Sequence, residues 1–119
     1  MARSFVAALC LLIVACGGAQ PVTFCERLEA DAARLKSILK ACPGSGDDNL
    51  YAFSMSKCEA TAVKDCTAKE QTTLLAVGDC EAKIAVCFLA SDRDRAVTAI
   101  QKCTAEASIG SACGSALSP

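Results

Sequence analysis

Ten cysteines in 119 residues are the feature that most limits how this chain folds. In a short exported protein, an even set of cysteines forms a disulfide framework that stabilises a small domain. In the cytosol, the same number of cysteines indicates metal binding or redox chemistry. What the cysteines do therefore depends on whether the chain carries an export signal.

The first 19 residues have the pattern of a secretory signal peptide. Arg3 gives a positively charged start, and residues 5–15 (FVAALCLLIVA) are uninterrupted apolar sequence. Small residues follow at positions 17–19. The apolar stretch is shorter than the roughly 20 residues that a stable membrane span needs. We therefore expect export; the alternative is a buried amino-terminal helix of a cytosolic protein.

Residues 12–16 (LIVAC) resemble the lipobox of bacterial lipoproteins, with Ile13 in the position usually taken by Leu. The resemblance implies that residues 1–15 are removed as a signal peptide and that diacylglycerol is attached to the sulfur of Cys16. The lipid bilayer would then be a partner through these acyl chains, since two or three chains anchor far more firmly than one. Gly17 at the next position, in place of Asp, implies the outer membrane or the periplasmic face of the envelope.

Ordinary signal-peptidase cleavage after Ala19 is the alternative to lipidation. It would release a soluble secreted protein that begins at Gln20. With lipidation, residues 16–22 form a tether, and by either route residues 23–119 form the folded domain.

Eight cysteines lie downstream of both cleavage sites, and we expect them to form four disulfides. They are Cys25, Cys42, Cys58, Cys66, Cys80, Cys87, Cys103 and Cys113. No two of them have the Cys-x-x-Cys spacing of redox motifs, compact zinc sites or iron–sulfur sites. We therefore expect no metal and no cofactor.

Apolar residues recur at spacings of three and four, which predicts an all-α fold, a small disulfide-rich bundle of four to five short helices. Four helix starts are marked by a Ser or Thr with an acidic residue three positions later, the pattern of a capping box. These pairs are Thr23/Glu26, Ser56/Glu59, Thr67/Glu70 and Ser91/Asp94.

The predicted helices cover most of the domain. The first runs from Cys25 to Cys42 and ends because Pro43 follows. The second covers residues 57–65, the third begins after Thr67 and extends to Cys87, and the fourth begins after Ser91. A last short turn covers residues 112–117.

An up-and-down arrangement of these helices divides the cysteines between the two ends of the bundle. Cys42, Cys58, Cys80 and Cys87 would lie near one end, and Cys25, Cys66, Cys103 and Cys113 near the other. A disulfide needs Cα atoms within about 7 Å, whereas seven or eight helical residues span about 10 Å or more. We therefore expect no Cys58–Cys66 or Cys80–Cys87 bond.

The composition excludes several functions. Twelve Lys and Arg residues balance 13 Asp and Glu residues, which argues against a nucleic-acid partner. The absence of His removes Ser-His-Asp and Cys-His catalysis, so we expect no enzyme and no catalytic residue. The acidic pairs Asp47-Asp48 and Asp92-x-Asp94 are assigned to a solvated loop and a helix N-terminus.

Three short motifs resemble small cysteine-rich bacterial lipoproteins and secreted proteins of unknown function. They are residues 24–28 (FCERL), 57–59 (KCE) and 65–67 (DCT). The resemblance implies an envelope location and a disulfide-rich helical fold, and it implies no particular activity. We expect a membrane-anchored extracytoplasmic lipoprotein with a structural or protein-interaction role and an envelope protein as partner. The alternative is a soluble secreted protein that binds an apolar ligand between its helices.

Overall fold

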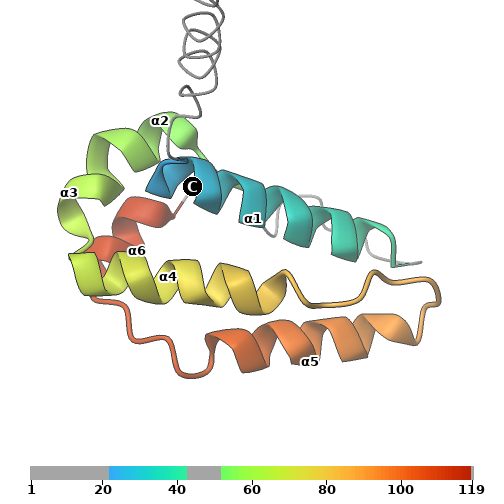
Figure 1. The fold of residues 1–119 in the computed structure, drawn as a ribbon. Helices are drawn as coiled ribbons and strands as arrows, with labels where there is room; N and C mark the ends of the chain where they lie inside the picture. Colours follow the sequence, from blue (N-terminus) through green and yellow to red (C-terminus); the bar gives the residue numbers. More distant parts are fainter. Residues whose placement is uncertain (1–21, 43–51, 119) are drawn as a thin grey trace, which may run out of the picture.

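The computed structural model describes residues 22–42 and 52–118. Within these ranges the regular elements are helices and there is no strand, which confirms the all-α prediction. The three long helices are α1 (Phe24–Lys40), α4 (Ala68–Glu81) and α5 (Asp92–Thr104). Between α1 and α4, the chain forms one continuous helical segment of α2 (Met55–Lys57), the π-helix η2 (Cys58–Ala62) and α3 (Val63–Asp65). The short helix α6 (Ser111–Leu117) follows α5 (Figure 1).

Two of the four predicted capping boxes are present. Thr23 caps α1, and its own N–H donates to the Glu26 carboxylate at 2.7 Å. Thr67 caps α4 in the same way with Glu70, also at 2.7 Å. Glu70 accepts a further hydrogen bond from the N–H of Gly110, at 2.7 Å. The cap of α4 therefore also fixes the residue that precedes α6.

The other two predicted capping boxes are wrong. The second helical segment starts two residues earlier than predicted, at Met55. Its cap is Ser54 rather than Ser56, because the Ser54 side chain accepts the N–H of Lys57. Ser91 precedes α5, but its side chain makes no capping hydrogen bond with the described residues. Asp92 instead accepts the N–H groups of Phe88 and Leu89, at 2.9 and 3.0 Å.

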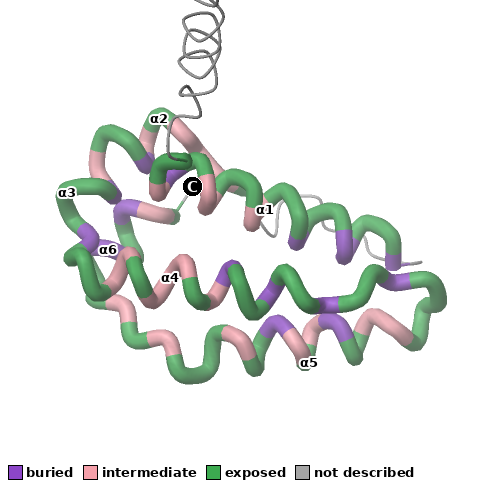
Figure 2. Tube along the Cα trace, in the orientation of Figure 1, coloured by how far each residue is buried: buried purple, intermediate pink, exposed green. Residues whose placement is uncertain are grey.

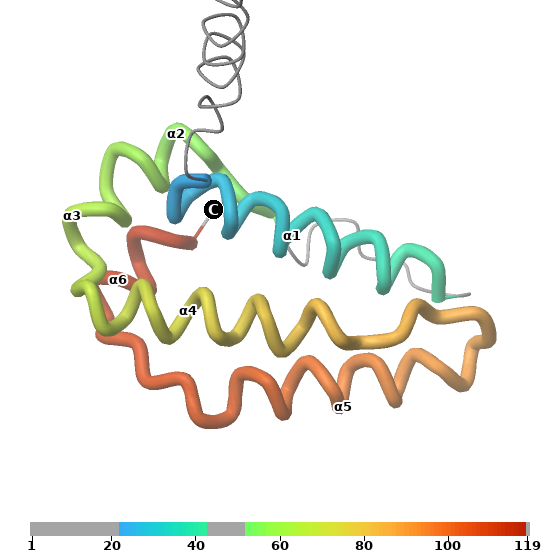
Figure 3. The backbone as a smooth tube through the Cα atoms, in the orientation of Figure 1, coloured from blue at the N-terminus to red at the C-terminus, as the bar shows by residue number. Residues whose placement is uncertain are grey.

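The predicted continuation of the third helix to Cys87 is also wrong. Helix α4 ends at Glu81, and the chain then runs without helix past Ile84 and Cys87, which are both buried. Extended backbone advances more than twice as far per residue as a helix. The chain therefore passes beyond the end of α4 before α5 turns back alongside it (Figure 3).

Four disulfides link the eight cysteines of the domain. The pairs are Cys25–Cys58, Cys42–Cys87, Cys66–Cys113 and Cys80–Cys103, with Cα atoms 4.5 to 5.9 Å apart. As expected, neither Cys58–Cys66 nor Cys80–Cys87 is bonded.

The predicted division of the cysteines between two ends is wrong for the pairs Cys25–Cys58 and Cys80–Cys103. The segment that holds Cys58 lies beside the beginning of α1, not beside its end as a simple up-and-down order requires. The extended stretch after α4 shifts α5 along the bundle, which brings Cys103 level with Cys80.

The buried side chains form two separate clusters (Figure 2). The first, which we call the aliphatic cluster, joins α1, the stretch after α4, and α5. Its buried members are Leu35, Ile38, Leu39, Cys42, Ile84, Cys87, Ala96 and Ile100. The second, which we call the cystine cluster, joins the start of α1 to residues 55–66 and α6. Its buried members are Cys25, Cys58, Ala62, Cys66, Cys113 and Ala116.

Candidate functional site

A cavity of about 260 Å³ lies between α1 and α4. Leu28, Ala32 and Leu35 line it from α1, and Leu74 and Val77 line it from α4. Because α1 is amphipathic, its apolar face turns toward α4, and Leu28 and Leu35 on that face belong to different clusters. The cavity therefore lies where the cystine cluster meets the aliphatic cluster.

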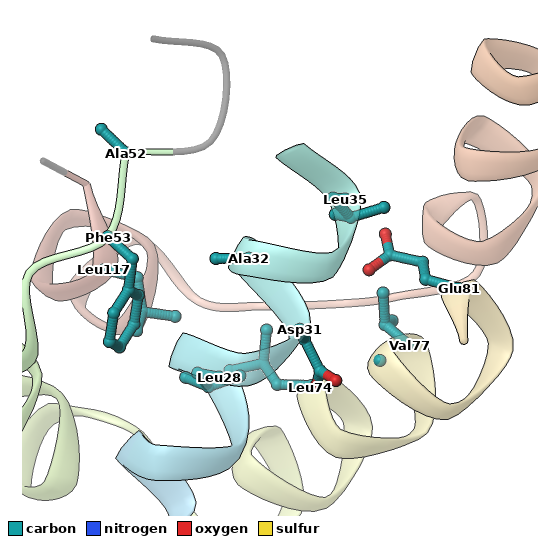
Figure 4. Close-up of a pocket in the computed structure, with 11 residues that line it drawn as sticks. Leu28, Asp31, Ala32, Leu35, Ala52, Phe53, Leu74, Val77, Glu81 and Leu117 are labelled. Atoms are coloured by element: carbon teal, nitrogen blue, oxygen red, sulfur yellow. The ribbon is translucent and has the colours of Figure 1, made fainter. Parts of the chain in front are cut away.

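The remaining wall comes from segments that are distant in the sequence. Ala52 and Phe53 line the cavity just before α2, and Leu117 lines it from the end of α6 (Figure 4). Phe53 and Leu117 also pack against the cystine cluster. The disulfides of that cluster therefore fix two of the cavity walls relative to α1.

Two carboxyl groups interrupt the apolar lining. Asp31 extends from α1 and Glu81 from α4, and each points toward the opposite helix (Figure 4). A small domain gains nothing in stability from burying carboxylates, because a buried charge needs a partner. Their presence in an apolar cavity is the most unusual chemical feature of the described structure.

Asp31 is accommodated by a glycine on the facing helix. A Cβ atom at position 78 would lie 1.9 Å from the Asp31 Oδ2 atom, so only glycine leaves room for this carboxyl group. Oδ2 is buried and has no hydrogen-bond partner among the described residues. Burial raises the pKa of Asp31, as does the charge of Asp79, while Arg27 and Arg34 act in the opposite direction.

Glu81 is the deeper of the two carboxyl groups, with 6% of the residue exposed. Its carboxyl group makes no hydrogen bond to any residue that the structure describes. Burial, and then the negative charge of Asp31, raise the pKa of Glu81 from its ordinary 4.5 to about 7. Glu81 therefore changes its protonation state near neutral pH.

The neighbouring arginines are engaged elsewhere. Arg27 forms an ion pair with Asp79 at 2.6 Å, and Arg34 donates a hydrogen bond to the carbonyl oxygen of Ala82. Neither arginine hydrogen-bonds to Asp31 or Glu81 in the described structure. Both arginines still lower the pKa of Asp31 through their charge, but among the described residues no Lys or Arg forms an ion pair with either carboxyl group.

No sequence pattern predicted this carboxyl pair. Asp31 falls among the polar positions of the first helix, and a charged residue at such a position is normally assigned to solvent. The available signal was Gly78, which is unfavourable inside a helix and marks a close approach of another group. Gly78 lies three residues before Glu81, so its position pointed to this face of α4.

The other candidate residues lie apart from the cavity. The eight cysteines are occupied by the disulfides. Asp92 accepts two backbone N–H groups ahead of α5, and these hydrogen bonds lower its pKa, in keeping with its assignment to a helix N-terminus. Cys16, the predicted lipidation site, and Asp47-Asp48 lie outside the described residues.

Two further findings concern the described ranges only. Residues 22–42 and 52–118 contain no group of three or more Cys, Asp or Glu side chains placed to hold a metal ion. None of the helices in the same ranges combines the length and the hydropathy that a membrane span requires.

Comparison with known proteins gives no relative from which to infer function. The sequence matches no protein-family model, and it has no significant similarity to a curated protein or a solved structure.

Proposed function

We propose that this chain is an exported, lipid-anchored helical domain that binds a small apolar ligand in the cavity between α1 and α4. The cavity itself carries the proposal, because its walls are mainly apolar and they come from four separate segments. Binding sites for small molecules are typically apolar hollows with a few polar groups that fix orientation. This arrangement favours ligand binding, the alternative considered in the sequence analysis, over the structural or protein-interaction role expected there first.

The location in the envelope rests on the leader. Residues 1–19 have the signal-peptide pattern, and Cys16 occupies the lipidated position of the lipobox. Four disulfides are consistent with folding in an oxidising compartment. Intact mass of the mature protein tests this part: acyl groups on Cys16 support anchoring, whereas a free start at Gln20 supports secretion instead.

Ligand binding is tested with 1-octanol and methyl NMR on the oxidised mature chain. We expect concentration-dependent shifts at Leu28, Leu74 and Val77, which line the cavity. Ala32→Leu places a larger side chain in the cavity and should abolish the shifts. Ala33→Leu is the matched control, because Ala33 is exposed on the same helix. Absence of shifts in the wild-type protein, or equal shifts in the Ala32→Leu protein, would contradict the proposal.

A second candidate function, binding of an envelope protein, is favoured by a different observation. Phe88 and Leu89 are 81% and 65% exposed in the connection between α4 and α5. This connection lies near the end of α1 and away from its beginning (Figure 1). Exposed apolar side chains gathered in one place commonly mark an interaction site.

Site-specific photo-crosslinking in intact cells tests the second candidate. A photoreactive residue at position 88 should give one discrete protein adduct, and the same residue at the half-exposed position 63 should give none. No adduct at position 88, or the same adducts from both positions, would remove this candidate.

A further inference from the structure

We infer that the ligand of this cavity is an apolar amine, whose protonated amino group lies between the carboxyl groups of Asp31 and Glu81. The inference rests on the proposed ligand-binding function and adds the chemical class of the ligand. Its apolar part would contact the leucine and valine side chains that line the same cavity.

The carboxyl groups of Asp31 and Glu81 both lack a hydrogen-bond partner among the described residues. The buried Oδ2 atom of Asp31 accepts no hydrogen bond from the described residues, and the carboxyl group of Glu81 accepts none from them either. A buried polar group without a partner destabilises the folded state, and more so when it is charged. A ligand that donates to both groups would remove this penalty, and an ammonium group has three donors.

The geometry of the pair also favours a cation. Asp31 and Glu81 come from facing helices, and both line the cavity (Figure 4). They are close enough for the charge of Asp31 to act on Glu81. A cation between two carboxylates lowers the repulsion between them, and it would occupy the polar end of an otherwise apolar space.

An ammonium group fits the two carboxyl groups better than a metal ion or an anionic lipid does. A calcium ion takes six to eight oxygen ligands, and Mg²⁺ requires octahedral geometry. Two carboxyl groups do not supply such a set, and no third Cys, Asp or Glu joins them in the described ranges. An anionic lipid such as a fatty acid would place a third carboxylate against the first two, which like-charge repulsion opposes.

The charged groups around the site lead to a pH dependence. Arg27 and Arg34 approach Asp31 along α1, and Asp79 approaches it from α4. Arg27 and Asp79 neutralise each other, and Arg34 is held by a backbone carbonyl group. Glu81 is therefore the group whose ionisation changes near neutral pH. Because an ammonium group binds its ionised form, the amine should bind more tightly as the pH rises from 6 to 8.

The test compares two ligands of the same chain length, octylammonium and 1-octanol, on the oxidised mature chain by isothermal titration calorimetry. A primary amine of this kind stays protonated up to about pH 10, as lysine does. At pH 8 we expect octylammonium to bind about tenfold to a hundredfold more tightly than octanol, the effect of a charge-assisted hydrogen bond. From pH 8 to pH 6 this advantage should fall by about tenfold, whereas octanol affinity should change little.

Glu81→Gln is the decisive variant, since it keeps the shape of the side chain and removes its charge. It should bind octanol as the wild type does, and it should lose both the preference for the amine and the pH dependence. Glu29→Gln is the matched control, because Glu29 is an exposed carboxylate on α1, and it should behave as the wild type.

The possible outcomes separate this inference from the proposed function. If octanol binds and octylammonium binds no more tightly, ligand binding stands and the amine assignment is overturned. If neither ligand binds, both are overturned. A preference for the amine that persists in the Glu81→Gln protein would also overturn the assignment.

Discussion

The two clusters that hold this domain together use different chemistry. The aliphatic cluster contains three Leu or Ile side chains from α1 and two more from outside it, together with a single disulfide. The cystine cluster contains two disulfides, and its other buried members are both alanines. Larger apolar residues such as Phe24 and Met55 only pack around it, partly exposed.

The difference shows how a small domain stabilises an end that lacks large buried side chains. Burial of a Leu or Ile side chain contributes about 1.5–3 kcal/mol, whereas Ala contributes far less because it has little surface. A disulfide contributes about 2–4 kcal/mol by restricting the unfolded chain, whatever surface it buries. The cystine cluster thus depends on covalent bonds, and the cavity lies where its small side chains meet the aliphatic cluster.

Complete reduction should have the largest effect, and it should affect the two clusters unequally. The four bridges together contribute an amount comparable with the whole stability of a small domain, which is about 5–15 kcal/mol. We expect the helical circular-dichroism signal to collapse near physiological temperature when a reductant is added. Hydrogen exchange during mild reduction should show residues 55–66 and α6 opening before α1 and α5.

An unchanged spectrum after full reduction would contradict this dependence on disulfides. Simultaneous loss of protection in both clusters would contradict the distinction between them.

The aliphatic cluster should instead be sensitive to truncation of a single side chain. Ile38 is 2% exposed, so Ile38→Ala should destabilise the domain by about 3 kcal/mol through lost burial and a new cavity. Val63→Ala, at a half-exposed position beside the cystine cluster, should change stability by less than about 0.5 kcal/mol. Urea denaturation of the oxidised proteins measures both, and equal losses would show that the aliphatic cluster is not a packed core.

Glu81→Gln should stabilise the domain at high pH only. The folded protein retains the Glu81 proton up to about pH 7, whereas the unfolded chain loses it near pH 4.5. Between these values the folded state binds more protons, so wild-type stability falls as the pH rises and then levels off above pH 7. The variant lacks this loss and should be more stable by about 3 kcal/mol at pH 8, with no difference near pH 4.

Denaturation at both pH values checks this prediction. A variant that is equally stable at pH 8, or less stable, would show that the Glu81 carboxylate is not destabilised by burial.

Gly78→Ala tests the contact between α4 and α1. Helix propensity alone predicts a gain of about 1 kcal/mol, because Ala is the better helix former. The structure predicts a loss of about 1–3 kcal/mol, because the added Cβ would overlap the Asp31 carboxyl group. Adding Asp31→Ala should remove the clash and recover the gain, so thermal melts of the single and double variants decide between the two effects.

The smallest predicted effect concerns the helix caps. Thr67→Ala removes a capping box and should destabilise the domain by about 1 kcal/mol. Ser91→Ala should change stability by less than about 0.5 kcal/mol, since Ser91 makes no capping bond with the described residues. If both substitutions have the same effect in chemical denaturation, the difference between the two caps is not real.

Two of the four predicted helix caps followed from the sequence. Thr23 and Thr67 marked true helix starts, because a capping box is a contact between residues three apart. The end of α4 did not follow, since Ile84 and Cys87 fit a helical spacing but are buried in the non-helical segment that follows α4.

Features that depend on distant parts of the chain could not be predicted. The Cys25–Cys58 pairing depends on where the second helical segment lies along α1, which no local pattern specifies. The carboxyl pair was missed for the same reason, because the buried Oδ2 atom of Asp31 lies against Gly78, which is 47 positions later in the sequence.

The central claim is that Asp31 and Glu81, in the cavity between α1 and α4, form a carboxyl pair that binds a cationic ligand. Direct measurement of the Glu81 pKa by ¹³C NMR of its carboxyl carbon, without ligand and with octylammonium, tests it most directly. The account predicts a midpoint near pH 7 in the free protein and a lower midpoint when the amine is bound. A midpoint near the ordinary 4.5, unmoved by the amine, would contradict it.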